Sequence, residues 1–304
     1  MASELGVKKK LKVAIPLMLA TAFFLSLQAL FVKLISPRLS VNVLTFTRCL
    51  INLIVFLAWY LIRKRGRSWR VLVHTKQWKL HAIRAAAGIG AIYCFYYGVH
   101  LLSLSSATLL TFSFPLFVPI VARLWLKIKL FHRLWWGLGV SFAGLVFILR
   151  PEKGVFDAWA LIPLLGALGV ATAVISVRRL HYTEPTDRIM AYFFVIGTGI
   201  SGLIMIIFPS WAKSTFSLYT LGIALLVGVL AVLCQTLLTL AMKYAPARLL
   251  SPFFYVTFVF GAGFDWLIFQ QPLHLGIAIG FLLVVIGSGL VIAFYPKEDL
   301  IFKR

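Results

Sequence analysis

The placement of basic residues along the chain constrains its fold more than any other feature. Ten long apolar stretches run through the 304 residues, and 24 of the 30 Lys and Arg residues lie at the chain ends or in every second gap between stretches. The basic clusters cover residues 8–12, 63–84, 123–133, 178–188, 243–248 and 297–304. Loops rich in Lys and Arg stay on the cytoplasmic side of a membrane. The alternation therefore predicts ten crossings with both termini in the cytoplasm.

Composition favours an all-α integral membrane protein. The chain is 62% apolar and 12% charged, too little polar surface for the outer faces of soluble helices. Each stretch has the roughly 20 residues that a helix needs to cross a bilayer, whereas a barrel would show short alternating strands. The predicted spans are 13–35, 41–62, 82–102, 104–123, 131–149, 157–178, 189–208, 217–240, 246–269 and 274–295.

The net charge of +22 fits membrane topology and anionic lipid headgroups better than nucleic acid. The basic segment 63–70 has no nucleic-acid-binding motif beside it. Cys49, Cys94 and Cys234 all lie within spans, so we expect no disulfide framework, no metal and no cofactor. The first apolar stretch is too long for a signal peptide, and we expect it to be a retained helix in a bacterial cytoplasmic membrane.

Weak internal similarity divides the chain into residues 1–150 and 151–304. The matching pairs are Ala107/Ala247, Trp125/Trp266, Gly137/Gly280 and Gly144/Gly287. Each half holds five spans, and because five is odd, the halves must enter the membrane in opposite orientations. Such inverted repeats are typical of secondary transporters, although duplication without transport is an alternative. Spans five and ten carry few polar side chains, so we expect their glycines to serve helix packing away from any central site.

Three stretches carry a resemblance to a known family. They are His81 to Gly88 continued by Tyr96 to Phe117, Arg150 to Phe156, and Ala245 to Phe269. With them the chain resembles the EamA branch of the drug/metabolite transporter superfamily, most closely its S-adenosylmethionine and riboflavin importers. The resemblance implies ten helices in two inverted repeats. The chain departs from the family at the ends of spans four and nine, where residues 126–129 (Leu-Lys-Ile-Lys) and 269–271 (Phe-Gln-Gln) stand in place of the usual Leu-Gly-Glu pattern.

Ionisable residues inside the spans are the first candidates for a solute site. A charged side chain at the bilayer centre costs about 2.5–3.5 kcal/mol on the translocon scale, so it should face a partner or water. Arg48 lies inside the second span, and Lys33 and Asp265 lie near the outer ends of the first and ninth. Asp265 is the natural counter-ion for one of these cations. Snorkelling of Lys33 and helix capping by Asp265 remain alternatives.

Helical spacing adds polar stripes to these charges. The predicted substrate-binding residues are Thr45, Arg48, Asn52, Tyr93, Tyr97, His100, Thr111, Gln235, Thr239, Ser251 and Tyr255. Within each span they recur at helical intervals and therefore share a face. Pro115 and Pro119 can kink the fourth span beside this face. Ordinary packing is the alternative for each stripe alone, and the convergence of several stripes favours a common site.

These features favour a secondary transporter of a small organic solute over an enzyme, because the six His residues are scattered rather than clustered. Arg48 can bind a carboxylate and the tyrosines can stack on a ring. S-adenosylmethionine, amino acids, nucleoside derivatives and vitamins are all compatible. Import and export stay open, as do proton coupling through Asp265 or His100, exchange, facilitated movement and the oligomeric state. A lipid flippase or a non-transporting scaffold is the remaining alternative.

Overall fold

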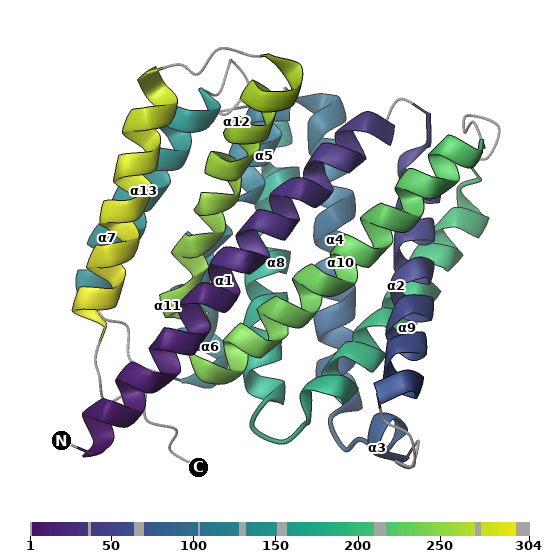
Figure 1. The fold of residues 1–304 in the computed structure, drawn as a ribbon, viewed down its shortest axis with the longest axis horizontal. Helices are drawn as coiled ribbons and strands as arrows, with labels where there is room; N and C mark the ends of the chain where they lie inside the picture. The colour runs from purple at the N-terminus through teal and green to yellow at the C-terminus, as the bar shows by residue number, and fades with distance from the viewer. Residues whose placement is uncertain are drawn as a thin grey trace.

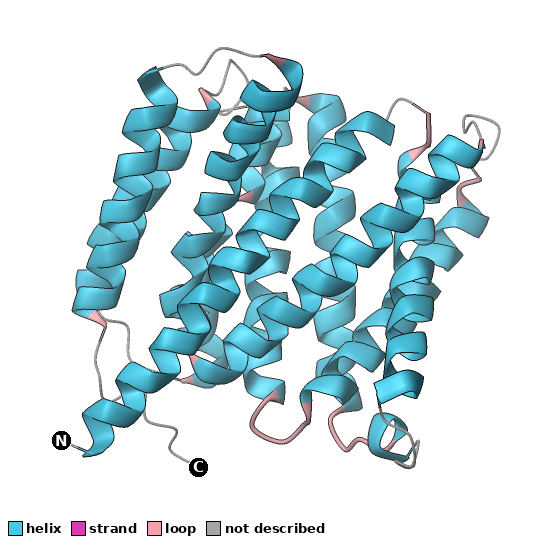
Figure 2. Cartoon of the chain, viewed as in Figure 1, coloured by secondary structure: helices cyan, strands magenta, loops and turns pink. Residues whose placement is uncertain are grey.

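The computed structural model describes residues 2–35, 38–63, 70–102, 104–127, 132–150, 157–209, 217–270 and 275–295. Within these ranges the chain is helical apart from short turns (Figure 2). Ten helical segments are long and apolar enough to cross a membrane, and their bounds lie within a few residues of the predicted spans. The all-α membrane class is therefore confirmed.

The ten spans are built from more than ten helices because two of them are interrupted. The helices are α1 (Ala2–Ile35), α2 (Val41–Arg63), α3 (Arg70–Val73), α4 (Trp78–Leu101), α5 (Leu104–Thr111), α6 (Phe114–Leu126), α7 (His132–Leu149), η1 (Ala158–Ala160), α8 (Leu161–Leu180), α9 (Thr186–Ile207), α10 (Leu218–Tyr244), α11 (Ala247–Leu250), η3 (Ser251–Tyr255), α12 (Val256–Phe269) and α13 (Leu275–Phe294). The start of α1 and the end of α13 lie at the same end of the bundle (Figure 1). We call it the basic end, since α2, α6, α8 and α10 also finish there with their cations.

The helices pack in pairs that each join one half of the chain to the other. Helix α1 packs against α10, α4 against α8, α2 against α9, and α7 against α13. In Figure 1 the α1/α10 pair crosses in front of the α4/α8 pair, with α2/α9 at one side and α7/α13 at the other. Exchanging the two halves turns α1/α10 into α8/α4 and leaves the other two pairs in place. This pattern is consistent with an inverted repeat.

The fourth and ninth spans are both broken. Helix α5 ends at Thr111 and α6 begins at Phe114, with Pro115 in the first turn, where its missing N–H needs no helical acceptor. In the ninth span, α11 and η3 precede α12, and Pro252 lies within η3. The two spans touch beside these breaks, where the ring centroids of Phe112 and Phe258 lie 4.6 Å apart in an edge-to-face arrangement. The proline-associated kink predicted for the fourth span is therefore a full break, with a counterpart in the ninth.

Glycines allow α7 and α13 to approach closely. A Cβ atom on Gly144 would lie 2.6 Å from the carbonyl oxygen of Gly280, and one on Gly137 would lie 2.8 Å from that of Gly287. Contacts this short exclude any side chain, so the four glycines form the seam between the two helices. This agrees with the packing role expected for them.

Replacing Gly144 with alanine should lower the stability of the protein by about 1–3 kcal/mol, because the methyl group has to push α7 away from α13. Gly139→Ala is the matched control, since no heavy atom lies within 4 Å of its added Cβ on the same helix. Thermal unfolding of the two purified variants measures the difference. Equal unfolding temperatures would show that the seam is not under steric constraint.

Candidate solute site

Arg48 lies on α2 and reaches between the front and back helix pairs. Its charge lies within electrostatic range of Tyr96 on α4 and of Cys234 on α10, which belong to different pairs. The side chain is half-buried. Among the described residues, none provides its guanidinium with a hydrogen bond or an ion pair. Arg48 is therefore an arginine inside a span whose guanidinium has no hydrogen-bond or ion-pair partner among the described residues.

Two hydroxyl-bearing side chains lie in the same region as Arg48. Tyr93 lies beside Thr45 and Tyr96, and it is 9% exposed. The hydroxyl groups of Tyr93 and Thr45 are both buried. The structure thus brings polar groups from α2 and α4 together near Arg48, while Gln235 lies half-buried on α10, which packs against α2. Tyr96 was not among the predicted residues, although it follows Tyr93 at the i+3 spacing that places two residues on one helix face.

Other residues of these stripes lie differently. In the amide orientation that satisfies its neighbours, the Asn52 nitrogen donates to the carbonyl oxygens of Gly228, at 2.8 Å, and Arg48, at 3.0 Å. Asn52 therefore joins α2 to α10. Tyr97 is 61% exposed, unlike the buried Tyr93 one turn before it. The side chain of His100 lies outside the described part of the chain.

Thr111 and Ser251 lie at the two span breaks. Thr111 ends α5 and Ser251 begins η3, and both side chains are buried. Neither hydroxyl has a hydrogen-bond partner among the described residues. Interrupted helices of transporters often place such groups at a solute site, so these two residues stay candidates.

Tyr255 and Thr239 are fully buried away from Arg48. Tyr255 packs with Leu109, Leu145 and Val284 between the broken spans and the α7/α13 pair. The Thr239 carbonyl oxygen lies 2.8 Å from Nε2 of His181, near the basic end. Neither hydroxyl group has a hydrogen-bond partner among the described residues, so a solute-binding role for Tyr255 and Thr239 stays a prediction.

Lys33 and Asp265 form an ion pair at the end opposite the basic end. Nζ of Lys33 lies 2.8 Å from Oδ1 of Asp265, joining α1 to α12. The two side chains are 50% and 38% exposed. A pair with this exposure contributes about 0–1 kcal/mol, so it is a weak link between the helices.

The basic end is closed by buried cations that the sequence indicated only as topology markers. Nη1 of Arg178, at the end of α8, donates to the carbonyl oxygens of Met242, at 2.8 Å, and Lys243, at 3.3 Å. These carbonyls end α10 and have no later helical N–H to accept from. Arg178 is 5% exposed. Together with His181 it fastens the back pair of helices to the front pair.

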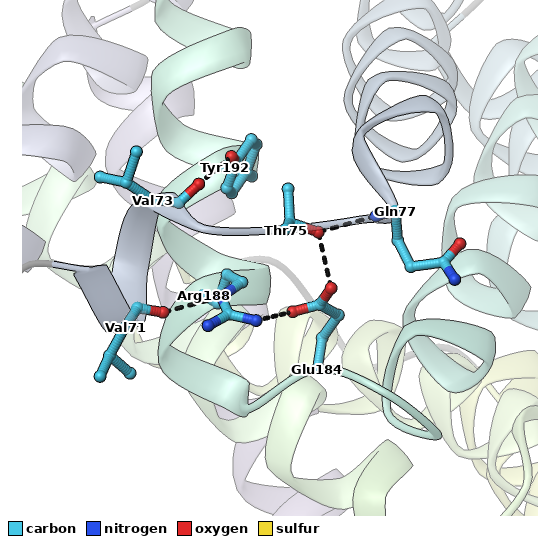
Figure 3. A network of polar contacts seen from close by, with 7 residues as sticks. All are labelled: Val71, Val73, Thr75, Gln77, Glu184, Arg188 and Tyr192. Atoms are coloured by element: carbon cyan, nitrogen blue, oxygen red, sulfur yellow. Dashed lines mark hydrogen bonds and ion pairs between the residues drawn. The ribbon is translucent and has the colours of Figure 1, made fainter.

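A second network holds the turn between α8 and α9 to the segment before α4 (Figure 3). Oγ1 of Thr75 donates to Glu184 at 2.6 Å, and Glu184 also pairs with Arg188. Arg188 Nε and the Tyr192 hydroxyl donate to the carbonyl oxygens of Val71 and Val73, at 2.7 and 2.6 Å. Because Glu184 is buried and its oxygens are satisfied, this network ties residues 71–75 firmly to α9.

Two more buried cations at this end donate hydrogen bonds within the protein. Arg84 donates to the Ile189 carbonyl oxygen at 2.6 Å and lies over the Phe193 ring. Arg248 donates to the Tyr295 hydroxyl at 3.0 Å. Within the described residues, no group of three or more His, Cys, Asp and Glu side chains could hold a metal ion. The chemistry available around Arg48 is therefore binding by charge, hydroxyl and ring.

His181 should make the stability of the basic end depend on pH. Burial lowers the pKa of His181 to about 4 from its ordinary 6.5; its bond to Thr239 opposes this shift, and the nearby charges of Arg84, Arg178 and Lys243 add to it. Between these pH values the unfolded chain binds a proton that the folded chain does not, so stability is lost as the pH falls from 6.5 towards 4. His181→Gln should reduce that loss by about 1–3 kcal/mol.

Chemical unfolding at pH 7.5 and pH 4.5 measures this effect, with wild type and variant compared at each pH. An identical pH dependence for the two proteins would contradict the role of His181.

Comparison with known proteins is consistent with this architecture. Residues 12–150 and 157–293 match the EamA-like transporter family. A solved crystal structure shares the fold with a TM-score of 0.77 at 20% identity, covering 91% of this chain and 96% of that one.

Curated relatives match over much of the chain. The pseudopaline exporter CntI of Pseudomonas aeruginosa is 27% identical over 90% of this chain and 94% of its own length. The riboflavin transporter of Brucella anthropi is 24% identical over 75% and 79% of the two chains. The S-adenosylmethionine uptake transporter of Rickettsia bellii is 26% identical over 58% and 59%. With the family match across both halves, the chain belongs to the EamA-like transporter family and is a multi-pass membrane protein, not an enzyme.

Proposed function

We propose that this protein moves a small organic metabolite that bears a carboxylate across the cytoplasmic membrane by alternating access, with Arg48 as its anchor. Arg48 carries the proposal because its guanidinium lies near residues of both helix pairs and has no hydrogen-bond or ion-pair partner among the described residues. A charge inside the membrane costs free energy, and a bound ligand that pairs with it best accounts for its presence. A carboxylate matches the planar fork of a guanidinium in a bidentate pair.

The groups around Arg48 favour a solute that also has a ring or polar arms. Tyr93 and Tyr96 offer ring faces, and Thr45 and Gln235 offer hydrogen bonds. The relatives named for riboflavin and S-adenosylmethionine support a metabolite of this size, and the exporter named for pseudopaline supports either direction of movement. We infer a metabolite of this class and leave import and export as alternatives.

We infer that the basic end faces the cytoplasm. Described cations gather there, including Arg123, Arg133 and Lys243, whereas Lys33, Arg38 and Arg150 lie at the opposite end. Positive charge is retained on the cytoplasmic side during insertion. Reporters fused to the two termini test this orientation, and signals from opposite sides of the membrane would reject it.

Arg48→Ala should reduce uptake or exchange of the transported metabolite in proteoliposomes by about tenfold or more, since it removes a charge-assisted bidentate bond. Arg123→Ala removes an exposed basic-end cation of α6 and should leave the rate unchanged. S-adenosylmethionine, riboflavin and amino acids are the first labelled solutes to measure.

Wild-type rates in Arg48→Ala vesicles would remove Arg48 from the solute site. A wild-type protein that moves no soluble metabolite but scrambles labelled lipid would favour a flippase instead.

We also infer that movement occurs by exchange or facilitated diffusion. Asp265 is engaged by Lys33 at 2.8 Å and lies near the bundle end, away from Arg48. Asp265→Asn should therefore keep the wild-type dependence of transport on pH. Loss of that dependence in the same vesicles would assign proton coupling to Asp265.

A further inference from the structure

We propose that Arg178 and His181 form the gate of the basic end, gripping the end of α10 and releasing it when the solute site opens to that side. The proposal rests on the proposed function, since a gate has meaning only for an alternating site. In this proposal, Arg178 and His181 lie outside the solute region and control the position of the helices around Arg48.

Side chains at the end of α8 and in the turn after it contact backbone carbonyl groups of α10. Arg178 donates to the carbonyl oxygens of Met242 and Lys243, and His181 lies 2.8 Å from that of Thr239. The carbonyls at a helix C-terminus carry partial negative charge, which a guanidinium stabilises. The contact requires no particular side chain on α10, so the helix can leave and return without repacking a specific side-chain pair.

The turn that carries His181 is anchored on its other side. Glu184 accepts a hydrogen bond from Thr75, and Arg188 donates to the Val71 carbonyl oxygen (Figure 3). These bonds hold the α8–α9 turn to the segment that leads into α4. Because the turn is fixed on the side of α4, the contact with α10 is the one that parts when the helix pairs separate.

The corresponding helices at the opposite end share no such bond among the described residues. Exchanging the halves of the chain replaces α8 and α10 by α1 and α4, and among the described side chains no hydrogen bond joins α1 to α4. One side-chain link of α1 at that end is the exposed pair of Lys33 with Asp265 on α12. Asn42 on α2 also donates to the carbonyl oxygen of Phe208 there, at 3.0 Å. Among the described residues, the structure therefore shows contacts of the buried Arg178 at the basic end and exposed side-chain links at the other.

Hydrogen–deuterium exchange of the full-length protein in lipid nanodiscs tests the gate without any solute. In Arg178→Gln, amides at the ends of α8 and α10 should exchange faster, on the order of tenfold for the loss of a charged hydrogen bond. Amides at the opposite end, in the last turns of α1 and α4, should exchange more slowly, because opening one end closes the other.

Two further variants make the result decisive. Arg179→Gln removes the neighbouring exposed cation, which lies over the Trp125 ring, and should exchange like wild type. His181→Phe keeps a ring but loses the bond to Thr239, so it should reproduce the reciprocal pattern if Arg178→Gln does not fold.

Faster exchange at both ends would reduce Arg178 and His181 to structural residues, and unchanged exchange would also overturn the gate. If transport depends on Arg48 but the reciprocal exchange pattern is absent, the gate is rejected and the proposed function stands. The reciprocal pattern in a protein that moves no solute keeps the gate and rejects the proposed function.

Discussion

An arginine placed between lipid-embedded helices needs a partner for its charge, and the structure depends on where each partner lies. Arg84 uses the Ile189 carbonyl oxygen, Arg178 uses the carbonyls that end α10, and Arg188 uses Glu184 and a carbonyl. All three lie at the basic end and tie helices together there. Arg48, the eighth residue of α2, has no hydrogen-bond or ion-pair partner for its guanidinium among the described residues. Arginines with protein partners thus tie helices together at the basic end, and Arg48 lies in the half of the bundle nearer the opposite end.

The paired architecture couples the two halves of the chain. Every principal helix contact joins the two halves of the chain, so a change in one half moves helices of the other. Along the α7/α13 seam, a Cβ atom added to Gly144 would lie 2.6 Å from the Gly280 carbonyl oxygen, so this flank is closely packed. The helices of the fourth and ninth spans change at Thr111 and Ser251. A closely packed flank and interrupted spans are compatible with the alternating access proposed for this protein.

Much of the fold followed from the sequence because the bilayer imposes a length and a charge rule on every span. The candidate site followed less well. Arg178 and Arg179 are adjacent and alike in sequence, yet one is buried against α10 and the other exposed, since only tertiary contacts separate them. Tyr255 shares a helical face with polar residues but packs into an apolar cluster. Helical periodicity shows which face of a helix is buried, but it does not show whether that face contacts a solute or a neighbouring helix.

The most direct test is whether an anionic solute pairs with the charge of Arg48. Thermal stability of purified wild type and Arg48→Gln can be measured against metabolites offered in pairs, each acid beside its own primary amide. Acids should stabilise the wild type, while their amides should not, and Arg48→Gln should lose the response to the acids. Equal stabilisation by an acid and its amide, or an undiminished response in Arg48→Gln, would contradict the assignment of this arginine.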